Sequence, residues 1–154
     1  MNVSVRWLNR YLDPADLGAE EAERVLTGAG FPIESATGLA EGDTRLDVEV
    51  TSNRGDCLCH LGLAREIAAA TGRKLKVPPG VGDAETASRA SGLGPVEEAV
   101  TLENRVPALC PTFRVRVIRG VRVGPSPGWL AGALEAAGHR PISNVVDVTN
   151  FVAL

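Results

Sequence analysis

Aromatic and sulfur-containing side chains are scarce in this sequence of 154 residues: aromatic residues make up 4%, and there are three Cys and one Met. A buried core must therefore be built mainly from Val, Leu and Ala. No run approaches the roughly 20 apolar residues that span a membrane, and no basic N-terminal region precedes an apolar stretch. We therefore expect a cytoplasmic protein. With 44% apolar and 23% charged residues, the chain suits one globular domain or two small ones.

The three cysteines are an odd number in a chain without a secretion signal, which favours reduced thiols over a disulfide framework. Cys57, Cys59 and His60 form the stretch "CLCH", and Cys110 is a conceivable fourth ligand of a zinc ion. Structural zinc sites space a cysteine pair by two to four residues, so this spacing fits poorly. Buried free thiols are the favoured interpretation, and we expect no metal site.

The net charge of −3 is unevenly distributed along the chain. Residues 1–104 contain 17 acidic and 10 basic side chains (−7), whereas residues 105–154 contain 6 Arg and 2 acidic side chains (+4). A polyanion could bind the basic part, but arginines that alternate along a strand more often form its solvated side. The candidates for a weak nucleic-acid contact are Arg114, Arg116, Arg119 and Arg122.

The first half of the chain has the patterns of a small α+β domain. Apolar residues recur at helical spacing over residues 4–12 and 17–29, and residues 45–51 alternate as a half-buried strand does. A further helix is predicted from a cap at Asp56 to a stop at Gly72. We therefore predict one compact domain over residues 1–75.

The second half begins with a connector. Residues 76–99 are rich in Pro, Gly, Ser and Ala, which predicts a linker between two domains. Residues 112–123 then alternate as a strand bent near Gly120. A helix is predicted over residues 126–138, with Ser126 as its cap.

The last eleven residues, "NVVDVTNFVAL", are ambiguous, since their valines and threonine favour a strand. Asn144 and Asp147 nevertheless have the spacing of a reciprocal helix cap, and Val145, Val148 and Val152 share one helical face. We predict a helix. Its apolar side needs neighbours that the rest of the chain scarcely supplies.

Three stretches together resemble the beginning of the beta subunit of bacterial phenylalanyl-tRNA synthetase. They are, in order, "VSVRWLNRYLD", "LDVEVTSNRGDCLCHLGLAREIAAATGR" and "VRVGPSPGWLAGALEAAGHRPISNVVDVTNFVAL". The resemblance implies an α+β chain with a small helix-rich domain at 1–75, a linker at 76–99, and the truncated start of a mixed α/β tRNA-editing domain at 100–154. The OB-fold insertion usual in bacterial members has no room here, because only "ATGLAEGDTR" connects the flanking segments.

The resemblance also implies a function. Family members form a heterotetramer with an alpha subunit, bind tRNA(Phe), and need ATP and Mg²⁺ for aminoacylation. The family places the ATP and phenylalanine sites in the alpha subunit, so we expect this stretch to bind no cofactor. We also expect it to bind neither DNA nor a membrane, and to be inactive as an isolated chain. The chain is expected to be a fragment that stops inside the editing domain. The alternatives are a free-standing module that binds tRNA or edits in trans, and a non-catalytic interaction domain of synthetase ancestry.

One residue matches a family position that lines the editing pocket, namely Asn150 in "VTN". An amide can both donate and accept hydrogen bonds, which suits the recognition of a tyrosyl ester. Alternatively, Asn150 only hydrogen-bonds neighbouring backbone. His60 and His139 match no catalytic position of the family, and we expect no catalytic residue within these 154 residues.

Overall fold

The computed structural model describes residues 1–78 and 95–154, which belong to two compact units. The larger unit comprises Met1–Pro79 together with Val123–Leu154, and the smaller one comprises Gly80–Arg122. The predicted boundaries at residues 75 and 100 stay a prediction, and most of the predicted linker, residues 79–94, lies outside the described residues. The last 32 residues of the chain therefore pack on its first part.

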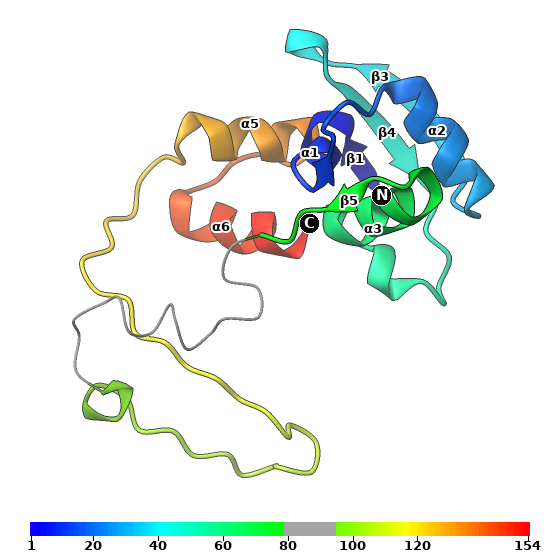
Figure 1. The fold of residues 1–154 in the computed structure, drawn as a ribbon. Coiled ribbons are helices and arrows are strands. Elements are labelled where there is room, and N and C mark those ends of the chain that lie inside the picture. Colours follow the sequence, from blue (N-terminus) through cyan, green and yellow to red (C-terminus); the bar gives the residue numbers. More distant parts are fainter. Residues whose placement is uncertain (79–94) are drawn as a thin grey trace. The chain divides into compact units, whose positions relative to one another are not determined.

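A three-stranded antiparallel sheet forms the centre of the larger unit (Figure 1). Its order is β1-β4-β3, with β1 at Asn2–Ser4, β4 at Thr44–Val48 and β3 at Ile33–Gly38. In β4 the buried side chains of Leu46 and Val48 alternate with half-buried ones, which confirms the strand predicted there. Residues 39–43 alone join β3 to β4 and include the short 3₁₀ helix η1 at Ala40–Gly42, so no barrel lies between these strands.

Three helices pack around the core of this unit, with α1 at Val5–Asn9, α2 at Ala19–Gly28 and α3 at His60–Thr71. A small second sheet pairs β2, Leu12–Asp13, with β5, Lys74–Leu75. The core consists of aliphatic side chains, the Cys57 side chain and one aromatic ring; its largest members are Leu8, Leu12, Leu26, Phe31, Leu46, Leu63 and Ile67. The α+β fold class and the helix over residues 17–29 are thus confirmed.

The first predicted helix is shorter than expected, because residues 2–4 join the sheet as β1. Ser4 then caps α1, and its Oγ accepts a hydrogen bond from Trp7 N at 3.0 Å. Ser4 Oγ also donates to Asp43 Oδ2 at 2.6 Å. The helix therefore begins where the edge strand ends.

The start of α3 was also predicted incorrectly. Asp56 does not cap this helix; it lies in a separate 3₁₀ turn, η2, at Gly55–Cys57. The cap is Cys59, whose Sγ accepts a hydrogen bond from Gly62 N at 3.4 Å. The predicted stop at Gly72 is confirmed, since this residue has φ 73°, in the left-handed region that glycine tolerates.

The two helices near the end of the chain are α5, Gly128–Ala136, and α6, Asn144–Ala153. Both were predicted, but their caps were not. Pro127 rather than Ser126 precedes α5, and Ser143 rather than Asn144 precedes α6. α5 lies against α6 and against β1, with Leu130 and Leu134 buried (Figure 1).

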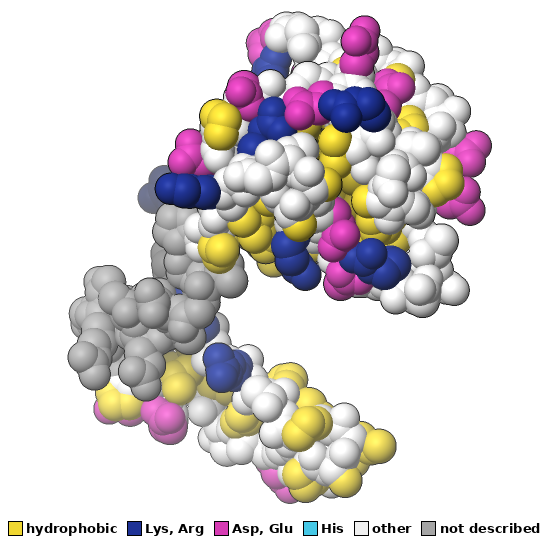
Figure 2. Space-filling model, turned by 45° about the vertical axis from the view of Figure 1, so that its right-hand side comes forward, with side chains coloured by type: hydrophobic (Ala, Val, Ile, Leu, Met, Phe, Trp, Pro, Cys, Tyr) yellow, Lys and Arg dark blue, Asp and Glu magenta, His cyan; other side chains and the backbone are white. Residues whose placement is uncertain are grey.

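The strand predicted over residues 112–123 is wrong: this described segment has no regular structure, and only η3 at Val96–Glu98 is helical between residues 95 and 122. A strand depends on hydrogen bonds to a neighbouring strand, and none of the described strands pairs with this segment. Apolar side chains of this segment consequently remain exposed, for example Phe113 at 58% and Ile118 at 71%. Figure 2 shows hydrophobic side chains on the surface of the molecule. No helix in the described residues has the length and apolar character needed to cross a membrane.

The backbone of α3 at Gly62 lies very close to the backbone of η2 at Asp56, which leads to a prediction about stability. A Cβ atom built on Gly62 would lie 2.0 Å from the backbone oxygen of Asp56, so Gly62→Ala must push η2 away from α3. We expect the free energy of unfolding to fall by about 1–3 kcal/mol, as in overpacked sites. Urea unfolding followed by circular dichroism measures it.

Gly132→Ala is the matched control, because Gly132 lies inside α5 and a Cβ atom added to it would meet no neighbour within 4 Å. This change should leave stability unchanged or raise it by about 0.5–1 kcal/mol. Equal effects of the two substitutions would contradict the close packing of η2 on α3.

Candidate functional site

Asp147 anchors the beginning of α6 and is the only residue of this helix that is buried. Its carboxylate accepts hydrogen bonds from Ser126 Oγ at 2.5 Å and from Ile142 N at 2.9 Å. The Ser126 hydroxyl holds the pKa of this carboxyl below its ordinary value, and the Ile142 and Ser143 amides add to the effect. The predicted reciprocal cap with Asn144 is wrong; Asn144 Oδ1 instead accepts from Gly124 N at 3.2 Å.

Asn150, the predicted pocket residue, lies one turn further along α6 and is half-buried. Its backbone oxygen accepts the Leu154 amide at 3.1 Å. Its side-chain amide makes no hydrogen bond to any of the described residues. The alternative in which Asn150 only bonds neighbouring backbone therefore finds no support at the side chain.

Beside Asn150, an aromatic cluster joins α6 to the beginning of the chain. The ring of Phe151 is stacked on the indole of Trp7, with centroids 4.6 Å apart and planes at 10°, and Trp7 is also stacked on His60 at 3.9 Å. Trp129 of α5 meets Phe151 edge-on at 5.5 Å. The Arg10 guanidinium lies 5.6 Å from the Phe151 centroid and 5.7 Å from that of Trp129. We call these five residues the Phe151 cluster.

His60 is completely buried and connects three elements. Its Nε2 accepts a hydrogen bond from the Ser4 amide at 3.1 Å, so Nδ1 carries the proton and donates to the Leu154 carbonyl at 2.7 Å. The backbone amide of His60 donates to the same carbonyl. Burial lowers the pKa of His60 from its ordinary value of 6.5 to about 4, against smaller raising effects of the Leu154 carbonyl and Asp43.

An open groove of about 760 Å³ lies between α1, the β3–β4 turn and α5. Trp7, Arg10 and Trp129 from the Phe151 cluster line it, together with Arg6 and Glu41. The two latter side chains form an ion pair at 2.6 Å. Asn150 does not line this groove, so the groove is separate from the predicted pocket residue.

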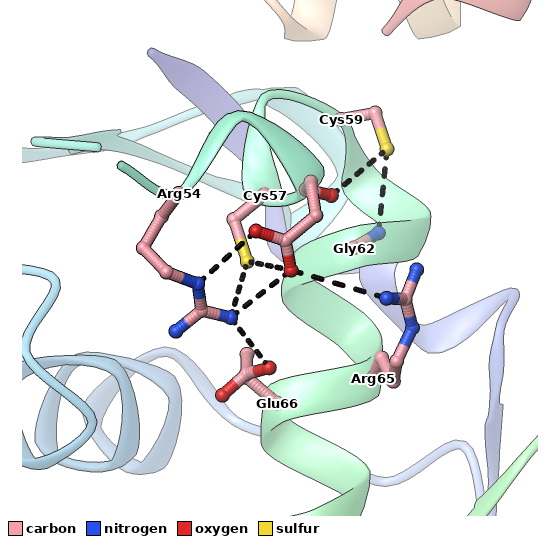
Figure 3. Close-up of polar contacts among 7 residues, drawn as sticks. Arg54, Cys57, Cys59, Gly62, Arg65 and Glu66 are labelled. Carbon is pink, nitrogen blue, oxygen red and sulfur yellow. Dashed lines mark hydrogen bonds and ion pairs between the residues drawn. The ribbon is translucent and has the colours of Figure 1, made fainter. Parts of the chain in front are cut away.

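Two cysteines of the "CLCH" segment, Cys57 and Cys59, take part in a group of polar contacts around Arg54 and Asp56, shown in Figure 3. Arg54 donates to Asp56 at 3.1 Å, to Glu66 at 2.8 Å and to the Cys57 sulfur at 3.2 Å. The guanidinium holds the pKa of Asp56 at about 2, and burial raises the pKa of Cys57 to about 11. Asp56, Cys57 and Glu66 lie close enough together to bind a metal ion, but a cation bound there would have to displace the Arg54 guanidinium.

Zinc at His60 would have to break both hydrogen bonds of its ring. Cys110, the conceivable fourth ligand, belongs to the smaller unit. The three free thiols are consistent with the expectation of reduced cysteines.

The four candidate arginines lie in the smaller unit and are exposed. They are Arg114, Arg116, Arg119 and Arg122. The structure therefore places them in a different unit from Asn150. The Phe151 cluster was missed by the sequence reasoning, although in a chain with 4% aromatic residues each Trp and Phe is a reasonable candidate for a special contact.

Comparison with known proteins gives consistent relatives. The family model of the B3/4 domain matches residues 109–154. The phenylalanine–tRNA ligase beta subunit of Rhodopirellula baltica is 44% identical over 154 residues, which is 100% of this chain and 21% of that protein. The beta subunit of Anaeromyxobacter dehalogenans is 45% identical over 129 residues, covering 83% of this chain and 15% of the relative.

The beta subunit of Moorella thermoacetica is 42% identical over 149 residues, covering 93% of this chain and 17% of the relative. The chain thus spans about a fifth, or less, of the length of these relatives. No solved structure matches the chain.

The neutral, buried His60 supports a prediction on pH. Its pKa is lower in the folded state than in the unfolded state, so the unfolded state binds more protons as the pH falls from 6.5 to about 4. The free energy of unfolding should be highest above pH 6.5 and fall in this window by up to about 1.4 kcal/mol per pH unit. Asp56 has a pKa of about 2 in the folded state, so its stabilising ion pair with Arg54 is lost by protonation only at lower pH.

Urea unfolding at several pH values tests this. His60→Gln, whose amide oxygen can still accept the Ser4 amide, should be less stable at pH 7 but nearly independent of pH between 6.5 and 4.5. Exposed His139 provides the control, and His139→Gln should keep the wild-type slope. A flat wild-type profile would contradict the prediction.

Proposed function

Because the chain belongs to the family of phenylalanine–tRNA ligase beta subunits, we propose that it works as part of such a subunit. Its partners would be the alpha subunit and tRNA(Phe). Its task would be to provide structure, tRNA contact and one edge of a site that hydrolyses mischarged tyrosyl-tRNA. ATP and Mg²⁺ would serve the ligase as a whole, and the isolated 154 residues would be inactive.

The observation that supports the editing role is the side-chain amide of Asn150, unpaired within the part of the chain that the structure describes. The B3/4 match covers this residue, and its amide lies half-buried on α6 without a hydrogen-bond partner among the described residues. A half-buried amide that is free to donate and accept can orient a polar substrate group. In a site that selects a tyrosyl ester, such a group would hydrogen-bond the phenolic hydroxyl or the terminal ribose.

The chemistry of such a site requires water to attack the ester carbonyl while polar groups stabilise the charge that develops on its oxygen. The Asn150 amide can hold the ester in place for that attack, but it is not a base. Neither histidine matches a family base: His60 is buried with both ring nitrogens bonded, and His139, exposed just after α5, corresponds to no catalytic position of the family. Hydrolysis would depend on groups from the remaining length of a beta subunit.

The arginines of the smaller unit support a second, weaker role in tRNA contact. Arg114, Arg116, Arg119 and Arg122 are exposed within nine residues of one another. Closely spaced guanidinium groups attract the phosphate backbone without reading its sequence. This role is compatible with the editing role and does not require it.

We predict that Asn150→Ala slows deacylation of tyrosyl-tRNA about tenfold or more, as loss of one well-placed hydrogen bond does. The test protein is a chimaera in which this chain replaces the matching residues of the Rhodopirellula baltica beta subunit, assembled with its alpha subunit. Release of tyrosine from purified tyrosyl-tRNA measures deacylation. Phenylalanylation should be unchanged.

Thr149→Ala is the matched control, because Thr149 is the polar neighbour of Asn150 on the same helix and is exposed. Its hydroxyl donates only to the Val146 carbonyl, at 2.6 Å. Thr149→Ala should leave both reactions unchanged. Equal deacylation by wild type and Asn150→Ala would refute the editing role.

A separate prediction concerns tRNA binding by the 154-residue chain. Binding should be weak and fall steeply with salt, and Arg114→Gln should reduce the slope of log K against log salt concentration by about 0.9, the value of one lost phosphate contact. Fluorescence anisotropy with labelled tRNA(Phe) measures it. Arg24→Gln, an exposed arginine of α2, should leave the slope unchanged; tight, salt-insensitive binding would contradict the prediction.

A further inference from the structure

We propose that the stacked pair Trp7 and Phe151 is a docking contact that fixes the last turn of α6 and thereby positions Asn150. Phe151 and Trp7 are positioning residues in this proposal, which rests on the proposed editing role for its functional consequence. The docking itself is a property of this chain and can be tested without any tRNA.

The first argument is how few side chains of α6 are buried, although Gly124 is hydrogen-bonded to Asn144 at its start and His60 to Leu154 just after its end. Asp147 is its only buried residue and fixes the first turn. The valines of the helix are exposed: Val145 is 46% exposed, Val148 50% and Val152 77%. Phe151 is half-buried, and its contacts with Trp7 and Trp129 are the aromatic contacts of the last turn. Asn150 therefore lies between one anchor at Asp147 and a second at Phe151.

The second argument is the rigidity of the surface that receives Phe151. Trp7 is 2% exposed, and its Nε1 donates to the Tyr11 hydroxyl at 3.2 Å. Its ring is stacked on His60, which is hydrogen-bonded to Ser4 of β1. The indole is thus held in its plane by contacts other than the one with Phe151. A fixed ring can set both the height and the orientation of the helix turn that packs against it.

The third argument is direction. Residues 150 and 151 are neighbours on a helix, about 100° apart around its axis. If Phe151 is seated on Trp7, the Asn150 side chain is held at a set angle from that contact. Removal of the ring would free the last turn to fray or rotate, and the Asn150 amide would lose its defined position.

Hydrogen exchange of the 154-residue chain, followed by mass spectrometry, tests the docking. In Phe151→Ala, amides of residues 149–153 should exchange roughly tenfold faster, the loss expected for one aromatic pair, while those of α3 keep the wild-type rate. Val152→Ala, a change at the exposed neighbouring residue, should leave both segments unchanged. Trp7→Leu should reproduce the effect of Phe151→Ala, and Trp7→Phe, which keeps a ring for stacking, should restore protection.

Unchanged exchange of residues 149–153 in Phe151→Ala would overturn the docking. An equal acceleration in α3 would also overturn it, since the contact would then belong to the global core. Because Phe151 is only half-buried, this variant remains informative even if the Trp7 variants fail to fold.

The functional consequence is tested in the chimaeric beta subunit by a double-mutant comparison. Phe151→Ala should slow tyrosyl-tRNA deacylation about as much as Asn150→Ala, without affecting phenylalanylation, and should add nothing in the Asn150→Ala background. Additive effects would overturn the positioning role. If Asn150→Ala has no effect, the proposed editing role fails, and the exchange experiment still decides whether Phe151 docks α6.

Discussion

The larger unit depends on one arrangement of rings, the stacking of Trp7 on both His60 and Phe151. Trp7 belongs to α1, His60 begins α3, and Phe151 lies in the last turn of α6, so these rings connect the first, middle and last parts of the chain. Besides this contact, the packing of α5 on β1 and the hydrogen bonds from His60 to Leu154 attach α5 and α6 to the rest of the unit. The scarcity of aromatic residues makes the arrangement more informative, since few other rings could replace it.

The polar groups behind the rings make the arrangement specific. Asp43 is buried, and its carboxylate accepts hydrogen bonds from the Ser4 hydroxyl at 2.6 Å and the Arg6 amide at 2.9 Å. Polar groups on both sides of the β1–α1 junction are therefore hydrogen-bonded. Among the described residues, no buried side-chain nitrogen or oxygen lacks a hydrogen bond. Since an unpaired buried group costs about 1–3 kcal/mol, alternative packings of α1 would be disfavoured. A helix of five residues is stable here because of its caps and not because of its length.

The spacing of apolar residues correctly predicted those helices and strands that bury one of their faces in the core. The helix α2, the strand β4 and the Gly72 stop of α3 were recovered because their apolar spacing or turn residue is decisive within a few positions. In α3, Leu61 is only half-buried, whereas Leu63 is fully buried. Leu63 belongs to the hydrophobic core, and between the two leucines Gly62 packs closely against η2. A contact of that kind leaves no periodic signal.

The features that were missed all depend on residues distant in the sequence. Apolar and polar residues alternate over residues 112–123 as they do in a strand. A strand forms only by hydrogen bonding to a partner strand, and none of the described strands pairs with this segment. The caps of α5 and α6 were misassigned because Ser126 and Asp147 bind each other across the two helices. The Phe151 cluster likewise brings together α1, α3, α5 and α6. Local pattern cannot distinguish such a contact from an ordinary apolar position.

The surface around Asn150 indicates what an editing site would still require. A pocket that binds a tyrosyl ester must enclose most of it, whereas Val145, Val148 and Val152 on the same helix are largely exposed. Apolar side chains exposed side by side are typical of surfaces that pack against another part of a protein. If α6 forms one wall of such a pocket, its docking by Phe151 fixes that wall, and the opposite wall must come from residues beyond those of the larger unit.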